Sequence, residues 1–193
     1  DNDTFPLWLL QDVFGIRTDI TVLNVSLLAI PEYRKQVFDK LSIPNLDKEF
    51  TDGATPESQK EIIDHIITCK TEGLRLYIGT PAWKQFDKYE KDLYIIGLVL
   101  EYSKENIDNI ALLKKNFENN YALDYIANQF NYDIGRPIVA RTNVNYLPGI
   151  IKLYQHYVLS GDHEKAGQYM KLGMTIAGQV GGEWKDKAAE IFK

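Results

Sequence analysis

Three apolar, β-branched stretches in the first half of the chain have the pattern of strands. Residues 18–31 (TDITVLNVSLLAIP) are almost continuously apolar, which predicts a strand covered on both faces, as in a parallel sheet. Residues 73–79 (GLRLYIG) and 92–103 (DLYIIGLVLEYS) predict a second and a third strand. Gly97 interrupts the third stretch and indicates a bulge or a point of close approach.

Helical patterns separate these stretches, over residues 5–14, 31–41, 55–70 and 80–89. Thr55 and Pro56 form a typical helix start, and the polar residues 42–55 before them predict a loop. The order of helix, strand, helix, helix, strand, helix, strand favours an α/β layer. We expect its strands to be parallel and joined by right-handed crossovers.

The second half of the chain has a different period. From about Asn106 the apolar spacing is helical, and Gly161-Asp162 separates two amphipathic helices. Ala166 and Gly173 supply small residues where these helices approach each other, so the pair resembles one tetratricopeptide-type hairpin. The predicted fold class is therefore α/β, a small mostly parallel sheet with covering helices in residues 1–103, followed by an α-helical tetratricopeptide-like region in residues 104–193 packed on it.

The opening residues Asp1, Asn2, Asp3 and Thr4 are the first candidate ligand-binding residues, and they stand at the start of a predicted helix whose N-cap is Thr4. In an α/β sheet such a helix follows a strand, so we expect an upstream first strand and interpret the chain as a fragment. Carboxylates and an amide at the end of a parallel strand suit ligand binding, including a hard cation. The favoured alternative is that they cap the helix and its positive end.

Two further pairs complete the candidate ligand-binding residues. Arg17 and Asp19 enter the first strand, and the favoured alternative is an ion pair that ties a loop to the sheet. Asn24 and Ser26 share one strand face by period two, and both need hydrogen-bond partners if buried. No residue is assigned a catalytic role.

Composition and motifs exclude several classes of protein. The net charge of −5 argues against a nucleic-acid partner, and no apolar run is long enough to span a membrane. The three histidines lack metal-ligand spacing, and phosphate-loop and dinucleotide motifs are missing, so we predict neither a metal nor a cofactor. Cys69 is interpreted as an inert thiol. Four aromatic residues could stack on a sugar, although ordinary packing is favoured: Tyr77, Trp83, Tyr89 and Tyr94.

The opening DNDTFPLW (residues 1–8), together with Gly15, RTD (17–19) and NVSLL (24–28), resembles a family of polytopic membrane proteins of unknown function. The family is common in Bacteroidetes and is similar to protein O-mannosyltransferases. The resemblance is dense over residues 1–28, recognisable over 93–105 and 143–177, and loose elsewhere. Phe14, Ala29 and Leu100 depart from the family pattern, and Leu100 cannot perform any role of the arginine expected there.

The resemblance implies that this chain is the region after the membrane helices, facing the periplasm, and that any glycosyl transfer takes place on membrane-embedded loops outside it. We therefore expect an extracytoplasmic accessory domain of a glycosyltransferase-like membrane protein. Its expected partners are a glycan or peptide acceptor and the rest of the parent protein. Two alternatives stay open: an interaction scaffold built on the helical hairpin, and a domain that supplies acidic site residues to the complete transferase.

Overall fold

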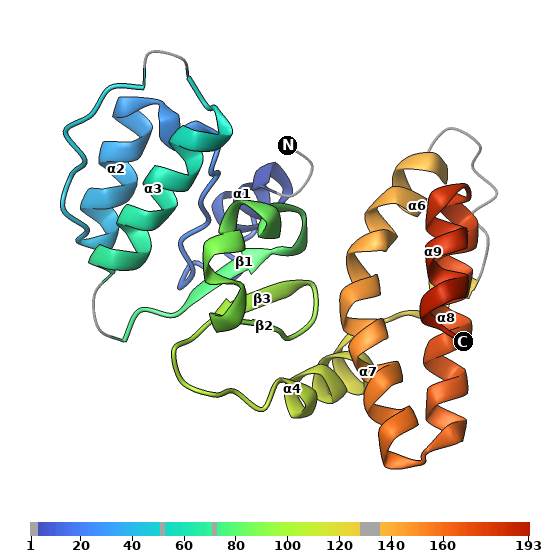
Figure 1. Cartoon of the computed structure of the whole chain (residues 1–193). Coiled ribbons are helices and arrows are strands. Elements are labelled where there is room, and N and C mark those ends of the chain that lie inside the picture. Colours follow the sequence, from blue (N-terminus) through green and yellow to red (C-terminus); the bar gives the residue numbers. More distant parts are fainter. Residues whose placement is uncertain (1–3, 51–52, 71–72, 128–135) are drawn as a thin grey trace. The chain divides into compact units, whose positions relative to one another are not determined.

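The computed structural model describes residues 4–50, 53–70, 73–127 and 136–193. It divides the chain into two compact units, Asp1–Leu74 and Arg75–Lys193, which are described separately. Figure 1 shows the course of the chain through both of them. The predicted boundary at residue 103 lies inside the second unit, and as a boundary between independent domains it stays a prediction.

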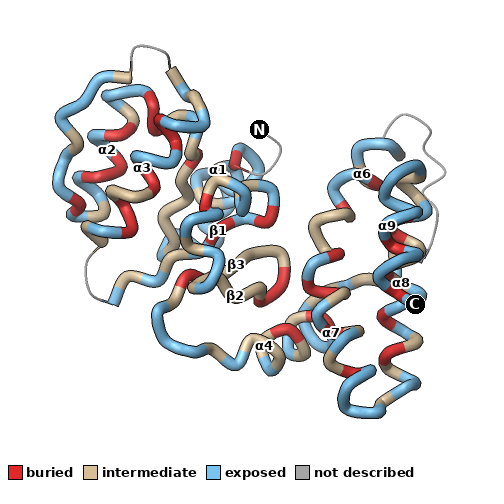
Figure 2. Tube along the Cα trace, viewed as in Figure 1, coloured by how far each residue is buried: buried red, intermediate tan, exposed pale blue. Residues whose placement is uncertain are grey.

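The first unit is helical in its described part. Its elements are α1 (Thr4–Asp12), the short 3-10 helix η1 (Leu27–Ala29), α2 (Pro31–Leu41) and α3 (Pro56–Cys69). Leu28 of η1, Phe38 of α2 and Ile62 of α3 are fully buried and form the centre of the core. Figure 2 shows buried positions alternating with exposed ones along α2 and α3, as expected for amphipathic helices.

The expected strand at residues 18–31 is wrong, because this stretch runs through turns into η1 and α2. Side chains, and not a neighbouring strand, bind much of its backbone. Trp8 Nε1 donates to the Val22 carbonyl (3.3 Å), and the Asn24 N–H donates to the Tyr33 hydroxyl (3.1 Å). These side chains take the place of sheet partners for the backbone, which explains why an apolar run alone does not make a strand.

The sheet lies in the second unit and is antiparallel throughout its described strands, which corrects the expected parallel arrangement. Its strands are β1 (Leu76–Gly79), β2 (Leu93–Ile95) and β3 (Val99–Tyr102), in the order β1-β3-β2 (Figure 1). The stretch predicted as one strand is thus a hairpin. Only residues 96–98 join β2 to β3, and a parallel connection needs a much longer crossover.

Gly97 explains where this hairpin turns. Its φ of 156° is uncommon for other residues, and a Cβ at this position would collide with the Tyr121 hydroxyl. The same hydroxyl accepts the Leu98 N–H at 3.2 Å, and Asn116 Nδ2 donates to the Ile96 carbonyl at 2.6 Å. The close approach predicted at Gly97 is therefore confirmed, and it attaches the hairpin to the helices that follow.

The rest of the second unit is helical, as predicted. After the 3-10 helix η2 (Thr80–Asp92) between β1 and β2, the helical elements are α4 (Asn109–Lys115), the π-helical turn η3 (Asn116–Asn120), α5 (Asp124–Ala127), α6 (Arg136–Asn143), η4 (Val144–Tyr146), α7 (Leu147–Ser160), α8 (His163–Val180) and α9 (Glu183–Ile191). Gly161 ends α7 in the left-handed conformation, and the Asp162 carboxylate caps α8 by accepting the Lys165 N–H.

Helices α7, α8 and α9 pack closely because small residues face large ones. A Cβ on Gly173 of α8 would collide with the Phe192 ring after α9 and would lie 3.3 Å from Ile150 of α7. Ala166 of α8 is buried as well. The predicted helical hairpin is therefore present, whereas its kinship with tetratricopeptide repeats stays a prediction.

Candidate functional site

Asn24 is the centre of a buried polar network in the first unit. It is 6% exposed, and its Nδ2 donates to the hydroxyl of Thr4, which is equally buried, at 3.3 Å. Its Oδ1 accepts the Leu27 N–H at 3.1 Å and so caps η1. Burial raises the pKa of Tyr33, whose hydroxyl accepts the Asn24 N–H. The hydrogen bonds of Asn24 with Thr4, Leu27 and Tyr33 thus connect α1, η1 and α2.

Helix α1 also binds the segment that follows it. Gln11 Nε2 donates to the carbonyls of Arg17 and Ile20, both at 2.8 Å. Trp8 and Gln11, one helical turn apart, thus hold the returning chain against a single side of α1. The Gln11 amide and the Trp8 indole thus donate hydrogen bonds to backbone carbonyls.

The structure describes three of the remaining predicted site residues. Arg17 and Asp19 form a bidentate ion pair at 2.8 and 2.9 Å, in which both side chains are about two-thirds exposed. The hydrogen bond from Arg17 lowers the pKa of the Asp19 carboxyl. Exposed Ser26 accepts a hydrogen bond from Gln59 Nε2 at 3.3 Å. Asp1, Asn2 and Asp3 lie outside the described residues, so ligand binding by the whole set stays a prediction.

Sequence reasoning missed Arg34, which fastens the loop after α2. Its side chain is almost fully buried, Nη1 donates to the Leu28 carbonyl (2.9 Å), and Nη2 donates to the Lys48 carbonyl (2.6 Å). The guanidinium lies 5.2 Å from the Phe50 ring centroid. Arg34 lies three residues before Val37 and four residues before Phe38, on the apolar side of α2. This spacing was the sequence signal that could have indicated its burial.

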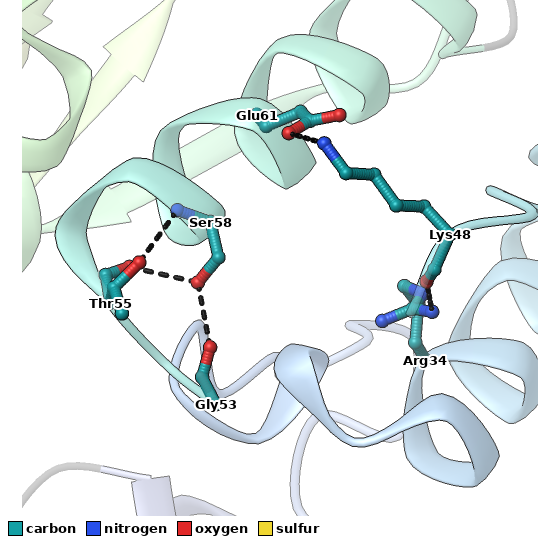
Figure 3. A network of polar contacts seen from close by, with 6 residues as sticks. All are labelled: Arg34, Lys48, Gly53, Thr55, Ser58 and Glu61. Carbon is teal, nitrogen blue, oxygen red and sulfur yellow. Dashed lines mark hydrogen bonds and ion pairs between the residues drawn. The ribbon is translucent and has the colours of Figure 1, made fainter. Parts of the chain in front are cut away.

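Figure 3 shows the polar contacts that continue from Arg34 towards α3. Lys48 Nζ pairs with Glu61 at 2.6 Å. At the start of α3 the Thr55 hydroxyl accepts the Ser58 N–H (3.2 Å), and the Ser58 hydroxyl donates to the Gly53 carbonyl (2.9 Å). The predicted N-cap at Thr55 is therefore confirmed. The polar contacts on this side of the unit stabilise its fold.

Cys69 has a histidine partner that sequence reasoning did not find. Its Sγ lies 3.8 Å from His65 Nδ1, one turn earlier on α3, and His65 Nε2 lies 2.6 Å from the Pro44 carbonyl. When Nε2 of the imidazole donates to the Pro44 carbonyl, Nδ1 accepts a hydrogen bond from the Cys69 thiol. Cys69 is the last residue of α3 and is half-buried, so a thiol held in this contact has a structural role.

Exposed apolar side chains lie on the outer side of α1 and on the turn after it. Large apolar side chains of the described segment 4–16 are 38–65% exposed. We call this set the α1 surface; it consists of Phe5, Leu7, Leu9, Leu10, Val13, Phe14 and Ile16. Asp12 carries the only formal charge in that sequence segment. Most large apolar side chains of this helix are thus directed outward, apart from that of half-buried Trp8.

This concentration of exposed apolar side chains is the feature of the first unit that most needs a partner. Contiguous apolar surface on a protein marks an interaction site, whereas single exposed apolar residues are normal. Among the described residues, no group of histidine, cysteine, aspartate and glutamate side chains could hold a metal ion. The exposed apolar side chains of the α1 surface indicate binding through apolar contact.

Comparison with known protein families gives a match over most of the chain. The family model of TMEM260-associated domain 2 matches residues 1–150, which include all of the first unit. No curated protein and no solved structure matches the chain. Within the part of the chain that the structure describes, no helix is both long and apolar enough to cross a membrane.

Proposed function

The chain belongs to the family of TMEM260-associated domain 2, and from this membership we propose that it is an accessory domain that attaches to the rest of a TMEM260-like membrane protein through the α1 surface. TMEM260 is a protein O-mannosyltransferase-like protein. In the proposal the domain lies on the extracytoplasmic side and assists the parent protein without carrying out sugar transfer itself.

The α1 surface is the observation that carries the proposal. Complete burial of one Leu or Phe side chain is worth about 1.5–3 kcal/mol. Covering the half-exposed side chains of this surface would therefore contribute on the order of 5–10 kcal/mol, before the costs of association. Because Trp8 and Gln11 hold the other side of α1, the helix is already in place when the partner arrives.

The chemistry of the surface defines the partner. Aliphatic and aromatic side chains dominate it, and Asp12 is exposed within it. A complementary surface would be apolar and low in charge, as at the contact between two permanently associated parts of one protein. Such a surface on the parent membrane protein fits better than a flexible, highly charged peptide.

The experiment expresses the chain as a separate polypeptide together with the remainder of its parent membrane protein, and measures co-purification. Val13 and Phe14, which are 65% and 63% exposed, are both replaced by Asp. Leu159→Asp on α7 is the matched control, because Leu159 is 88% exposed and lies outside the α1 surface. We expect the double variant to lose at least about tenfold in retention, equivalent to about 1.4 kcal/mol.

The unfolding midpoint of each variant is measured in parallel, and all three proteins should unfold alike because the substituted side chains are exposed. Equal retention of the double variant and the control would overturn the proposal. Retention that falls together with the unfolding midpoint would show that residues 13 and 14 serve the fold of the unit instead.

A second candidate function rests on a groove in the second unit. Among the described residues, an open and mainly apolar groove lies between α8 and α9, bordered by Gly167, Met170, Met174 and Phe192. Methionine-lined grooves adapt to apolar peptide segments, so this groove supports the interaction-scaffold alternative. Gly167→Phe should fill it, because nothing lies within 4 Å of the position of a Cβ there. Unchanged co-purification of protein partners with this variant would refute the scaffold.

A further inference from the structure

The exposed apolar side chains of α1 are spread around the helix and are not confined to one narrow stripe. Successive residues of an α-helix lie about 100° apart around its axis. The hydrogen bond from the Val13 N–H to the Leu9 carbonyl (3.0 Å) continues the helical course past Asp12. Counted from Phe5, the exposed apolar side chains therefore cover an arc of about 200°. In order around this arc they are Phe5, Leu9, Val13, Leu10, Phe14 and Leu7.

The rest of the circumference carries the contacts within the first unit. Thr4, Trp8 and Gln11 lie within about 60° of one another around the axis, and all three bind residues 17–24. Asp12 lies next to this polar side, at the edge of the arc. The arc itself therefore contains no charged residue, and the hydrogen bonds that hold α1 in place use only the opposite side of the helix.

The width of the arc defines the shape of the partner. A helix that packs on one surface has an apolar stripe about 100° wide, whereas a helix that is apolar around most of its circumference is enclosed by other elements. The arc of α1 is twice as wide as such a stripe. A flat surface would therefore cover only part of it, and complete cover needs contacts from two sides.

The size and chemistry of the arc fit a protein groove. The α1 surface presents on the order of 700 Å² of apolar area, because its large side chains are each about half exposed. A stable protein interface buries roughly 800 Å² on each partner. A helix that lies on a membrane surface carries lysine and arginine on its polar face, and residues 1–16 contain neither. A protein partner is thus favoured over a lipid surface.

We propose that the parent membrane protein receives α1 in an apolar groove with two walls. One wall contacts the side of α1 that carries Leu9, the other contacts the side that carries Leu7, and Val13 faces the floor. A helix bound in an apolar groove is a recurring mode of recognition between proteins. This inference rests on the proposed attachment through the α1 surface and adds the shape of the partner to it.

The two leucines give a matched pair for the test. Leu7 and Leu9 are 46% and 54% exposed and lie about 160° apart around the axis, so a single flat surface cannot cover both. Leu7→Glu and Leu9→Glu are measured singly by co-purification with the remainder of the parent protein. Each should lose about tenfold in retention, because each wall would then bury an unpaired carboxylate. Leu159→Glu on α7 is the control and should be retained like the unchanged chain.

Glutamate and leucine have similar helix propensities, so the unfolding midpoints of both variants should match that of the unchanged chain. If a midpoint falls, Leu7→Gln and Leu9→Gln repeat the comparison without a charge. Loss of retention in only one of the two variants overturns the two-walled groove and leaves attachment through the α1 surface in place. No loss in either variant, and none in the Val13→Asp and Phe14→Asp double variant, overturns the proposed function as well.

Two other occupants of the arc are tested with the same variants. Sedimentation measures self-association of the chain, and flotation measures its binding to vesicles of phosphatidylcholine and phosphatidylglycerol. We expect neither to persist once the remainder of the parent protein is added. A dimer or a vesicle complex that does persist, and that both glutamate variants abolish, would assign the arc to a second copy or to lipid and would overturn the inference.

Discussion

The close packing of α8 on its neighbours can be tested with two glycines of that helix. Gly173 is buried, and a Cβ there would collide with the Phe192 ring and lie 3.3 Å from Ile150 Cγ2. Gly167 lies in the same helix, and nothing is found within 4 Å of the position of its Cβ. Replacement of either residue by alanine changes the backbone preference in the same way, so the pair isolates the steric effect.

The two expected changes in the free energy of unfolding follow from the helix and from packing. Alanine in a helix interior is favoured over glycine by roughly 0.5–1 kcal/mol, so Gly167→Ala should stabilise the chain by that amount. Gly173→Ala receives the same gain, but the extra methyl group overpacks the core at a cost of about 1–3 kcal/mol. The two variants should therefore differ by about 1–3 kcal/mol, with Gly173→Ala the less stable.

Urea unfolding followed by circular dichroism measures this difference, because the midpoint shifts while the slope stays constant when only stability changes. Phe192→Leu in the Gly173→Ala background should recover part of the loss, since a smaller side chain then faces the new methyl group. Equal midpoints for Gly167→Ala and Gly173→Ala would refute the reasoning, because the Phe192 ring could then not lie over Gly173.

Three further changes test other contacts. Asn24→Ala should cost about 1–2 kcal/mol of stability, measured by urea unfolding, because the Leu27 N–H loses its cap. Gly97→Ala should cost more than Gly97→Ala combined with Tyr121→Phe, because the new Cβ collides with the Tyr121 hydroxyl. Glu118 has a lowered pKa because a tyrosine and a lysine donate to its carboxylate. The stability that ionised Glu118 contributes is fully present above its ordinary pKa of 4.5, and it is lost as the pH falls through the lower pKa of the folded state. Glu118→Gln should therefore flatten the acid limb of a plot of stability against pH.

The helices could be predicted because their signals are local. Thr55 and Pro56 fix the start of α3, and Gly161 with Asp162 fixes the turn between α7 and α8. Helix capping and a left-handed glycine depend on a few neighbouring residues. The residues that begin or end a helix can therefore be recognised in the sequence at the helix end itself.

The sheet could be predicted only in part, since strand pairing is not local. The apolar run at residues 18–31 satisfied the pattern of a buried strand, yet Trp8, Gln11 and Tyr33 bind its backbone instead. Residues 92–103 satisfied the pattern of one strand, although Gly97 divides them into two. Period and composition say which residues can be buried, and they do not say which backbone partner is available.

The candidate site shows the same limit. Sequence reasoning selected Thr4 and Asn24, which the structure brings into contact, but it could not foresee that α1 would direct most of its apolar side chains outward. Buried Arg34 was missed because an arginine in an amphipathic helix is ordinarily assigned to the solvent face. Both features depend on which side of a helix has a neighbour, and this is decided by the rest of the fold.

The extent of the family match bears on how the second unit folds. The match ends at residue 150, four residues into α7, yet buried Leu113 and Phe117 lie before that point and pack around Gly149. The same core cluster continues with Leu153 and Ile176, which lie beyond it. Phe117 would lose much of its cover without α7 and α8, and an exposed aromatic core residue destabilises a small domain. Helices α7–α9 therefore complete the core of the second unit, whose first part lies within the matched region.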